Sequence, residues 1–416
     1  MTNRLDSMEH YIARDAELAR LRQWRDKDVF KVVTGVRRCG KSTLLAMFAN
    51  ELAADGVPPD RIVRLNLEDF ALAHLLGDPR AFHDHVASLL ATSGRSYLFI
   101  DEVQLADSFE TVVNSLALRF DVDVYLTGSN ARMLSSELAT RLSGRYTELH
   151  LLPLSFGEFA AARLAAGIGG EDLSYPGMYA SYLRNGGFPL VQQLIPNPKA
   201  AFDYLHGILN TVLVKDVSIR QKVSDAGLLI DVASYLFDNI GNLTSRRRIA
   251  DTLKSGRHPS PGTVDSYLDG LVDAFLLYPA RRWDVKGLRY LVGPDKYYAV
   301  DPGLRNAMVG YSGDDTGHLL ENVVYLELRR RHADVRVGAS PGGEVDFVVV
   351  EGGDSTYYQI AQTVRSADAL SRELRPLQAI KDHYPKVLLT ADPEPPISHD
   401  GVRQLYVLDW LRGTET

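Results

Sequence analysis

Eight consecutive residues near the amino terminus have the spacing of a phosphate-binding loop. The segment Gly35 to Ser42 reads GVRRCGKS and fits the pattern G-x-x-x-x-G-K-[ST]. Glycines let such a loop curl until its backbone N–H groups face phosphate oxygens, and the N-terminus of a following helix adds a favourable dipole. We therefore expect Lys41 to reach the β- and γ-phosphates of a bound nucleotide and the Ser42 hydroxyl to help hold Mg²⁺.

The other residues of this loop are predicted nucleotide contacts because of their positions in the pattern. The full predicted set is Gly35, Val36, Arg37, Arg38, Cys39, Gly40, Lys41, Ser42 and Thr43. Arg37, Arg38 and Cys39 occupy its variable positions, and we interpret Cys39 as a packing residue. Because the chain has 1 cysteine, it forms no internal disulfide and indicates no oxidising compartment.

Two carboxylates follow an apolar run farther along the chain. Residues 97–100 read YLFI and precede Asp101 and Glu102. Because burying paired acids at the end of a strand is costly, a bound cation is the expected reason for them. We predict that Asp101 binds Mg²⁺ through water and that Glu102 is the general base for the attacking water. The alternative is an exposed loop with solvated acids.

Polar and basic residues follow the next two apolar segments. Residues 124–127 lead to Gly128, Ser129 and Asn130, and Asn130 is predicted to orient the same water or to sense the γ-phosphate. Arg141 and Arg145 precede the segment 146–151. An arginine at such a place can enter a neighbouring subunit's site as an arginine finger, with Arg145 the first choice and Arg141 the second. This implies a homo-oligomeric ring, of which a hexamer is one form, or at least a pair of subunits; surface salt bridges are the alternative.

A parallel sheet is needed to bring these side chains together. Strand-like segments are expected at 29–34, 62–67, 97–100, 122–127 and 146–151, with helical patterns between them. Such alternation is typical of an α/β fold, a parallel sheet with helices on its faces.

Taken together, these motifs resemble those of the AAA-type P-loop ATPases, and more narrowly the bacterial and archaeal ATPases that carry an uncharacterised C-terminal domain. The shared segments are, in order, the phosphate loop, YLFIDE (97–102), LTGSN (126–130), LSGRY (142–146), LLPLSFGEF (151–159) and GGFP (186–189). The resemblance implies ATP and Mg²⁺ as ligands. In related signalling (STAND-like) ATPases a glycine–x–proline turn in the lid contacts the adenine, and residues 187–189 look like that element, so Pro189 is a predicted contact. A turn that only ends a helix is the alternative.

Between residues 242 and 283 the sequence has the pattern of a winged helix-turn-helix. One helix is expected around residues 249–253, a second after Ser260-Pro261, and a wing strand from 275–279 with 280–283. The second helix of such a module can enter the major groove of DNA. Candidate phosphate contacts are Arg246, Arg247, Arg248, Lys254, Arg257, Arg281, Arg282 and Lys286. Acidic residues on the second helix would repel DNA, so docking of a protein partner is the alternative.

The last segment carries a helical Glu321 and two strand residues, Asp346 and Gln359. Their order resembles the restriction-endonuclease-like nuclease fold, in which a Glu, an Asp and a Glu/Gln-x-Lys pair gather a divalent metal. Ala361 stands in the lysine position, which favours a silent relative that binds nucleic acid or protein. An active nuclease and ordinary helix–strand packing are the alternatives.

These observations divide the chain into five segments. We predict an N-terminal helical segment (1–28), an AAA-type ATPase core (29–155), a helical lid (156–227), a winged helix-turn-helix (228–293) and an α/β restriction-endonuclease-like domain (294–416). The expected function is Mg²⁺-dependent ATP hydrolysis that remodels, translocates on or switches a complex on DNA, with branched DNA among the candidates. The alternatives are a signalling ATPase switch acting on a protein partner without DNA and an ATP-gated nuclease. The net charge is −7 and no long apolar stretch occurs, so we expect a cytoplasmic protein without membrane contact.

Overall fold

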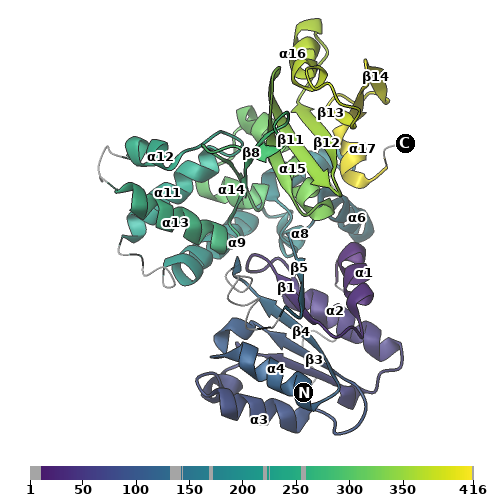
Figure 1. Ribbon diagram of the computed structural model, residues 1–416, viewed down its shortest axis with the longest axis vertical. Coiled ribbons are helices and arrows are strands. Elements are labelled where there is room, and N and C mark those ends of the chain that lie inside the picture. The colour runs from purple at the N-terminus through teal and green to yellow at the C-terminus, as the bar shows by residue number, and fades with distance from the viewer. Residues whose placement is uncertain are drawn as a thin grey trace. The chain divides into compact units, whose positions relative to one another are not determined.

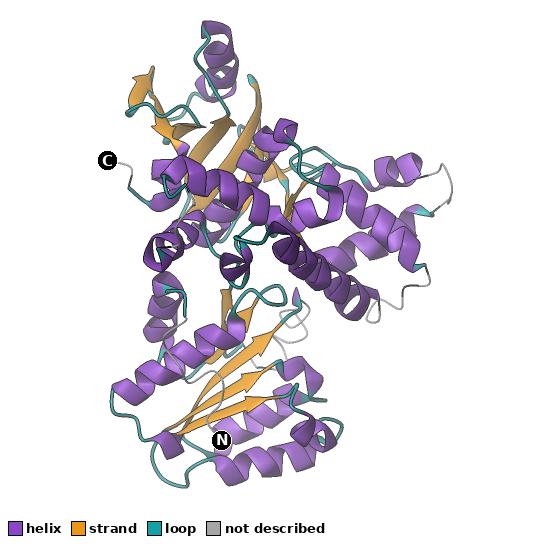
Figure 2. Ribbon diagram, turned by 180° about the vertical axis from the view of Figure 1, so that it is seen from behind, coloured by secondary structure: helices purple, strands orange, loops and turns teal. Residues whose placement is uncertain are grey.

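The computed structural model describes residues 11–131, 142, 144–167, 172–218, 223, 225–253 and 259–414. Contacts divide the chain into two units (Figures 1 and 2). Unit 1 comprises Met1–Leu151 with Asp273–Phe275, and unit 2 comprises Leu152–Val272 with Leu276–Thr416. Each unit is described by itself.

Unit 1 is built on a five-stranded parallel sheet. Its strands are β1 (Phe30–Thr34), β2 (Ile62–Asn66), β3 (Ser96–Asp101), β4 (Val122–Gly128) and β5 (Tyr146–His150). Their order across the sheet is β2-β3-β4-β1-β5. The prediction of an α/β core with a parallel sheet is confirmed, and each expected strand forms within a residue or two of its predicted limits.

Helices cover both faces of this sheet (Figure 1). They are α1 (Asp15–Trp24), α2 (Lys41–Ala54), α3 (Pro79–Leu89) and α4 (Phe109–Arg119), with short 3-10 turns η2 (Pro59–Arg61), η3 (Phe70–Leu75) and η4 (Val103–Leu105). Side chains alternate along the strands. Phe99 and Tyr125 stack at 4.8 Å and contact Phe48 of α2. Their neighbours Leu98 and Val124 belong to the apolar core beneath α3 and α4.

The sheet of unit 1 also encloses an ion pair. Lys31 on β1 and Asp123 on β4 are each 1% exposed, and the Lys31 ammonium donates to the Asp123 carboxylate. The Tyr125 hydroxyl, at 2.9 Å, and the Asp26 backbone N–H, at 2.8 Å, donate to the other oxygen of Asp123. Burial lowers the pKa of Lys31, and the Asp123 charge opposes this shift. A charged pair therefore fills an otherwise apolar layer.

Unit 2 begins with helices. They are α6 (Phe156–Ala166), α7 (Tyr175–Asn185), α8 (Val191–Leu194), α9 (Pro198–Thr211), the π-helix η6 (Val212–Ser218), α11 (Ala226–Asp238), α12 (Arg246–Thr252), α13 (Pro261–Asp273) and α14 (Pro302–Val309). Local sequence explains several starts. Ser155 forms a capping box with Glu158. Ser174 and Asn197 each accept a bond from the first helical turn, near a proline that suits that turn.

The remainder of unit 2 is an eight-stranded sheet with the order β14-β15-β13-β12-β11-β10-β7-β8. Its strands are β7 (Arg282–Asp284), β8 (Arg289–Tyr290), β10 (Val335–Ser340), β11 (Gly343–Glu351), β12 (Asp354–Ala361), β13 (Lys386–Thr390), β14 (Ile397–His399) and β15 (Val402–Tyr406). Three helices accompany it, α15 (Thr316–Arg331), α16 (Ala367–Gln378) and α17 (Val407–Arg412), with the turn η8 (Gly313–Asp315). Tyr325 of α15 contacts Phe347, whereas Leu377 of α16 packs with Val348, so α15 and α16 lie on opposite faces.

The expected wing differs from the structure. The sequence predicts a wing strand from residues 275–279 with 280–283, whereas the structure divides these residues between two sheets. Instead, β6 (Leu277–Ala280) pairs with β9 (Lys296–Ala299), while β7 pairs with β8 and, in parallel, with β10. β7 thus has backbone partners on both sides, β8 in a local hairpin and β10, and the Arg336 guanidinium of β10 lies 3.9 Å from the centre of the Trp283 ring. Within the described residues, no helix is long and apolar enough to cross a bilayer.

Candidate nucleotide site

The phosphate-binding loop joins β1 to α2, as the sequence predicts. Gly35 and Gly40 have φ angles of 146° and 108°, which side chains other than glycine rarely adopt. A Cβ atom on Gly35 would lie 2.2 Å from the carbonyl oxygen of Leu151. Both glycines of the motif are therefore required by the backbone path, and α2 begins at Lys41 with its N–H groups facing the loop.

Lys41 lies folded over this loop. Its side chain is buried, and its ammonium donates to the carbonyl oxygens of Gly35 at 2.9 Å and Val36 at 3.1 Å. Of the variable positions, Arg37 forms an ion pair of 2.9 Å with Glu68. The Cys39 side chain is completely buried, and burial raises the pKa of its thiol. These contacts give Cys39 a packing environment and leave Lys41 as the loop's cation.

The two predicted acids end β3 and are bound to β4. The Thr127 hydroxyl donates to Asp101 and accepts from the backbone N–H of Glu102 at 2.9 Å. Ser129 donates to the Glu102 carboxylate at 3.2 Å. Glu102 is 7% exposed, so the alternative of an exposed loop with solvated acids does not describe it.

Strand order explains how these groups meet. β4 lies between β1, which leads into the phosphate loop, and β3, which carries the acids. All carboxyl ends of a parallel sheet face the same edge. The polar tip of β4, including the buried Asn130, therefore lies between the loop and the acids. The role of Asn130 in orienting water or sensing the γ-phosphate stays a prediction.

A cavity of about 300 Å³ adjoins the loop. Its lining residues include Ser42, Asp101, Asn66 at the end of β2 and Glu68 just after that strand. Hydroxyl and carboxylate oxygens are the donors that Mg²⁺ takes when phosphates supply its other ligands. The predicted metal residues thus fit the ion. Sequence reasoning missed Asn66 and Glu68, although Asn66 ends β2 and Glu68 follows it at this edge.

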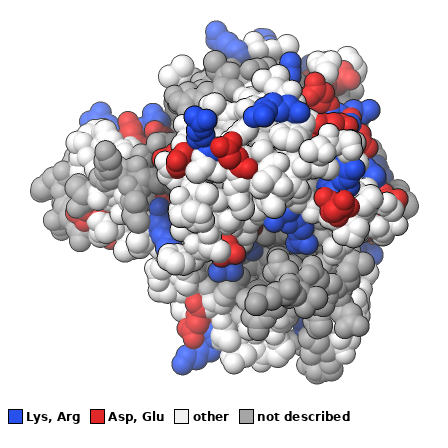
Figure 3. Space-filling model, turned by 90° about the horizontal axis from the view of Figure 1, so that it is seen from below, with Lys and Arg blue, Asp and Glu red and all other residues white. Residues whose placement is uncertain are grey.

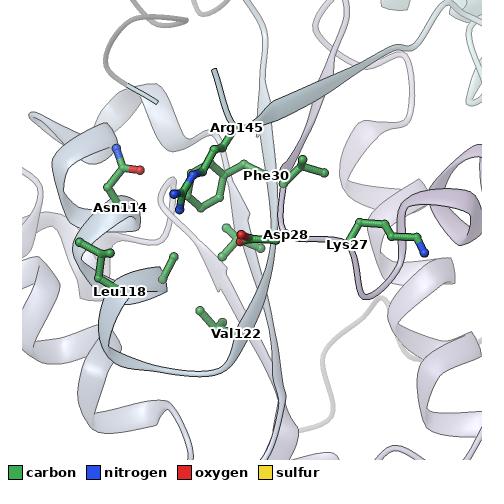
Figure 4. Close-up of a pocket in the computed structure, with 10 residues that line it drawn as sticks. Lys27, Asp28, Phe30, Asn114, Leu118, Val122 and Arg145 are labelled. Carbon is green, nitrogen blue, oxygen red and sulfur yellow. The ribbon is translucent and has the colours of Figure 1, made fainter. Parts of the chain in front are cut away.

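Arg145 lies at the opposite end of the sheet. The backbone N–H of Phe30, the first residue of β1, donates to the Arg145 carbonyl at 2.8 Å. At about 3.3 Å per residue, β1 keeps Arg145 roughly 13 Å from its own phosphate loop. The exposed Arg145 side chain lines a second cavity, of about 250 Å³, with Asp28, Asn114 and Leu118 (Figure 4). Arg141 lies outside the described residues.

Comparison with known proteins agrees with this geometry. Residues 27–160 match the family described as an AAA domain. A Haemophilus influenzae protein, named only as uncharacterized, is 36% identical over 402 residues, 96% of this chain and 98% of that protein. The chain belongs to the family of this Haemophilus protein. It carries a P-loop AAA ATPase domain.

Two further proteins are similar to this chain. An uncharacterized protein of Methanocaldococcus jannaschii is 27% identical over 365 residues, 85% of this chain and 79% of that protein. A solved Walker-type ATPase of Pyrococcus abyssi has a TM-score of 0.50 at 15% identity and covers 72% of this chain and 97% of that one. This second likeness shows the fold. Residues 177–315 match a family described as a domain of unknown function.

Hydrogen bonds within unit 2 hold the glycine–x–proline turn in place. The Gly187 N–H donates to the Asp301 carboxylate at 2.6 Å, and its carbonyl accepts from the Leu154 N–H at 2.7 Å. A Cβ on Gly186 would meet Asp301 at 2.0 Å, which excludes any other residue there. Packing accounts for both glycines, and adenine contact by the half-buried Pro189 stays a prediction.

The predicted DNA contacts lie on two elements of unit 2. On α12, Arg246 pairs with Asp265 of α13 at 2.8 Å. On the strands near β10, the Arg281 guanidinium lies 4.1 Å from the Tyr290 ring centre. The described members of the set are Arg246, Arg247, Arg248, Arg281, Arg282 and Lys286, while Lys254 and Arg257 lie outside the described residues. On the face drawn in Figure 3, basic and acidic side chains are interspersed.

The acids of the C-terminal segment surround a lysine that sequence reasoning missed. Lys296 is 4% exposed, and its ammonium lies 2.9 Å from Glu321 and 2.8 Å from Glu344. Burial opposes its charge, but Glu321, Asp346 and Glu344 outweigh burial and raise the pKa of Lys296. Burial and the Glu321 charge raise the pKa of Asp346 well above its usual range. The side-chain Oε1 of Gln359 accepts from the Asp346 backbone N–H at 3.4 Å, so the three predicted residues lie in one cluster.

Proposed function

We propose that this protein is a Mg²⁺-dependent ATP hydrolase that remodels, moves along or switches a complex on DNA. The convergence of Lys41, Ser42, Asp101 and Glu102 at one edge of the five-stranded sheet carries the ATPase part of the proposal. A phosphate loop alone binds nucleotide, whereas a buried carboxylate beside it also supplies a base.

The residues divide the reaction among them. Lys41 and the loop N–H groups bind the phosphates, and Ser42 and Asp101 hold Mg²⁺, which neutralises charge on the phosphates when bound. Glu102 accepts a proton from water as the water oxygen attacks the γ-phosphorus. The bond from that phosphorus to the β–γ bridging oxygen then breaks, giving ADP and inorganic phosphate. Asn130 orients the water.

The position of Arg145 supports action on a neighbouring subunit. It is exposed and lies at the far end of β1 from its own phosphate loop, so its charge is available to a second copy. We propose that Arg145 completes the site of an adjacent protomer in a ring or a pair. Arg141 is the second candidate for this role.

Contact with DNA is proposed for α12 and the strands near β10. Three consecutive arginines begin α12, with Arg247 90% exposed at its side chain. Such side chains bind phosphates with an affinity that falls steeply as salt is added. Arg246 pairs with Asp265 of the second helix, so this acid has a cation beside it. A signalling switch with a protein partner, related to the STAND-like ATPases, is the other reading, and it predicts no salt-dependent DNA affinity.

We propose that the nuclease-like C-terminal segment binds nucleic acid or protein without cutting it. Lys296 places an ammonium between Glu321 and Glu344, where a nuclease of this type would bind a metal ion. A built-in cation neutralises these acids. Ala361 also leaves the usual lysine position empty of charge. Both observations disfavour the ATP-gated nuclease.

The test is steady-state ATP hydrolysis, alone and with single-stranded, duplex or branched DNA, using Glu102→Gln as the blank. Stimulation by one DNA form would support the whole proposal and name the preferred DNA. Equal turnover with and without DNA would retain the ATPase and favour a protein partner. Wild-type turnover no faster than that of Glu102→Gln would refute the hydrolase.

A further inference from the structure

The side chain of Gln104 lies against the proposed general base. Gln104 belongs to the 3-10 turn η4, directly after Glu102, and its Nε2 donates to Glu102 Oε2. Ser129 donates to the same oxygen at 3.2 Å, and Gln104 Nε2 lies 3.4 Å from the Ser129 hydroxyl. Two donors, the Gln104 amide and the Ser129 hydroxyl, therefore fix one carboxylate oxygen and the orientation of the whole carboxylate.

The backbone helps to hold this arrangement. Glu102 has φ 53° and ψ 47°, the left-handed region that residues with side chains rarely adopt. Strained residues of this kind persist where the surroundings fix them, and they gather at functional sites. Here the Thr127 hydroxyl accepts the Glu102 N–H and so holds the strained residue against β4. This turn places Gln104 beside the Glu102 carboxylate.

The other end of the Gln104 amide has no partner within the part of the chain that the structure describes. Its Oε1 atom is buried and accepts no hydrogen bond there. The assignment of the two amide atoms follows from chemistry, because an ionised carboxylate only accepts and so must face the NH₂ group. A buried acceptor without a donor is costly. The orphaned Oε1 therefore points to a missing donor next to the base.

We propose that Gln104 is a positioning residue that orients both Glu102 and the attacking water. The inference rests on the proposed ATP hydrolysis. A water molecule has two protons: one is donated to Glu102 Oε1, which accepts no hydrogen bond among the described residues, and the other to Gln104 Oε1. With both protons bound, a lone pair of the water oxygen is free for the γ-phosphorus. Glu102 accepts the first proton during the attack. The second proton stays bonded to the water oxygen, which becomes part of the phosphate product, and remains hydrogen-bonded to Gln104 Oε1.

The test compares Gln104→Ala with Gln23→Ala, the same change at an exposed position of α1. Loss of one positioning hydrogen bond predicts that kcat of Gln104→Ala falls about tenfold or more, with the ATP dissociation constant within about twofold. Gln23→Ala retains wild-type turnover. A Gln104→Ala kcat within about twofold of wild type would overturn the inference.

A second variant separates positioning from packing. Gln104→Met keeps the size of the side chain but removes both its donor to Glu102 and its acceptor for water. Its kcat should fall as far as that of Gln104→Ala with little change in the ATP dissociation constant, whereas a role in packing alone would leave Gln104→Met near wild type. A Gln104→Met kcat within about twofold of wild type would refute the role of these hydrogen bonds. If wild type and Glu102→Gln turn over equally, the proposed function itself fails, whatever Gln104 does.

Discussion

Replacing Asp123 by Asn removes one charge from the interior of unit 1 and leaves the side-chain shape almost unchanged. Asp123 and its partner Lys31 are each 1% exposed. If one of the two charges is removed, water cannot reach the other charge and solvate it. Breaking such a pair by removing one partner costs about 3–5 kcal/mol, because the remaining charge stays buried. Tyr125 and the Asp26 N–H must also share the weaker amide oxygen. We expect a loss of stability within this range.

The loss depends on pH with a definite sign. Burial already lowers the pKa of Lys31, and without the Asp123 charge that opposes it the pKa falls further. The unfolded chain holds its Lys31 proton up to the ordinary pKa of 10.5, whereas the folded variant releases it at lower pH. In this window the unfolded state binds more protons, so unfolding free energy rises with pH. The deficit of Asp123→Asn should be largest near neutral pH and shrink toward pH 10.

Amide hydrogen exchange of the full chain, read by mass spectrometry, measures this locally. Peptides covering residues 28–35 and 120–128 report on β1 and β4. A loss of about 3–5 kcal/mol predicts exchange about 10²- to 4 × 10³-fold faster in these peptides. The matched control is Asp121→Asn, whose side chain is 59% exposed and lies 3.6 Å from Arg95. An exposed pair contributes under about 1 kcal/mol. Equal exchange in the two variants would refute the argument from burial.

Four further outcomes follow from the structure. Lys41→Ala should abolish ATP binding in a fluorescent-nucleotide titration, and retained affinity would remove Lys41 from the site. Arg145→Ala should lower turnover with unchanged ATP affinity. Mixing it with Glu102→Gln subunits should restore part of the activity, because the first variant keeps the base Glu102 and the second keeps the arginine. No recovery on mixing would speak against action between subunits. Burial raises the pKa of Asp301 to about 6 from an ordinary 3.8, so the folded chain binds more protons between these values. Its contribution to stability therefore falls by about 2 kcal/mol as pH rises from 4 to 6. Asp301→Asn should lack this slope in denaturant titrations, and parallel slopes would contradict the reasoning. Without nucleotide, Lys296→Gln should gain affinity for Mn²⁺ by calorimetry, while binding by the wild type would show that its acids are not neutralised.

Local patterns were sufficient to predict unit 1. The glycines and lysine of residues 35–42 serve one short loop, and the apolar run 97–100 ends in its acids, so spacing alone locates them. Lys31, inside an apolar strand, reveals nothing until β4 brings Asp123 beside it. The pairing of β7 with β10 likewise joins distant segments, which no periodicity encodes.

The same limit applies to the candidate sites. Lys296 contacts Glu321 and Glu344 only through tertiary packing. Sequence position alone therefore could not show that Lys296 supplies a lysine to the cluster whose usual lysine position holds Ala361. The proposed role of Gln104 depends on which end of its side-chain amide faces Glu102. Residue order predicts which strand ends meet, whereas hydrogen-bond partners are set by side-chain directions within the folded chain.

The bond between Gly187 and Asp301 also bears on how the chain is made. These residues are 114 positions apart, and Asn306 further donates to the carbonyl oxygens of Leu183 and Arg184 at the end of α7. A ribosome adds about 5–20 residues per second, so the end of α7 waits roughly 6–20 s for its partners. During that interval the apolar side chains Met178 and Leu183, buried in the finished protein, have no α14 to cover them. Nascent chains of this protein therefore present a fixed target for a chaperone, at one place and for a time set by translation speed.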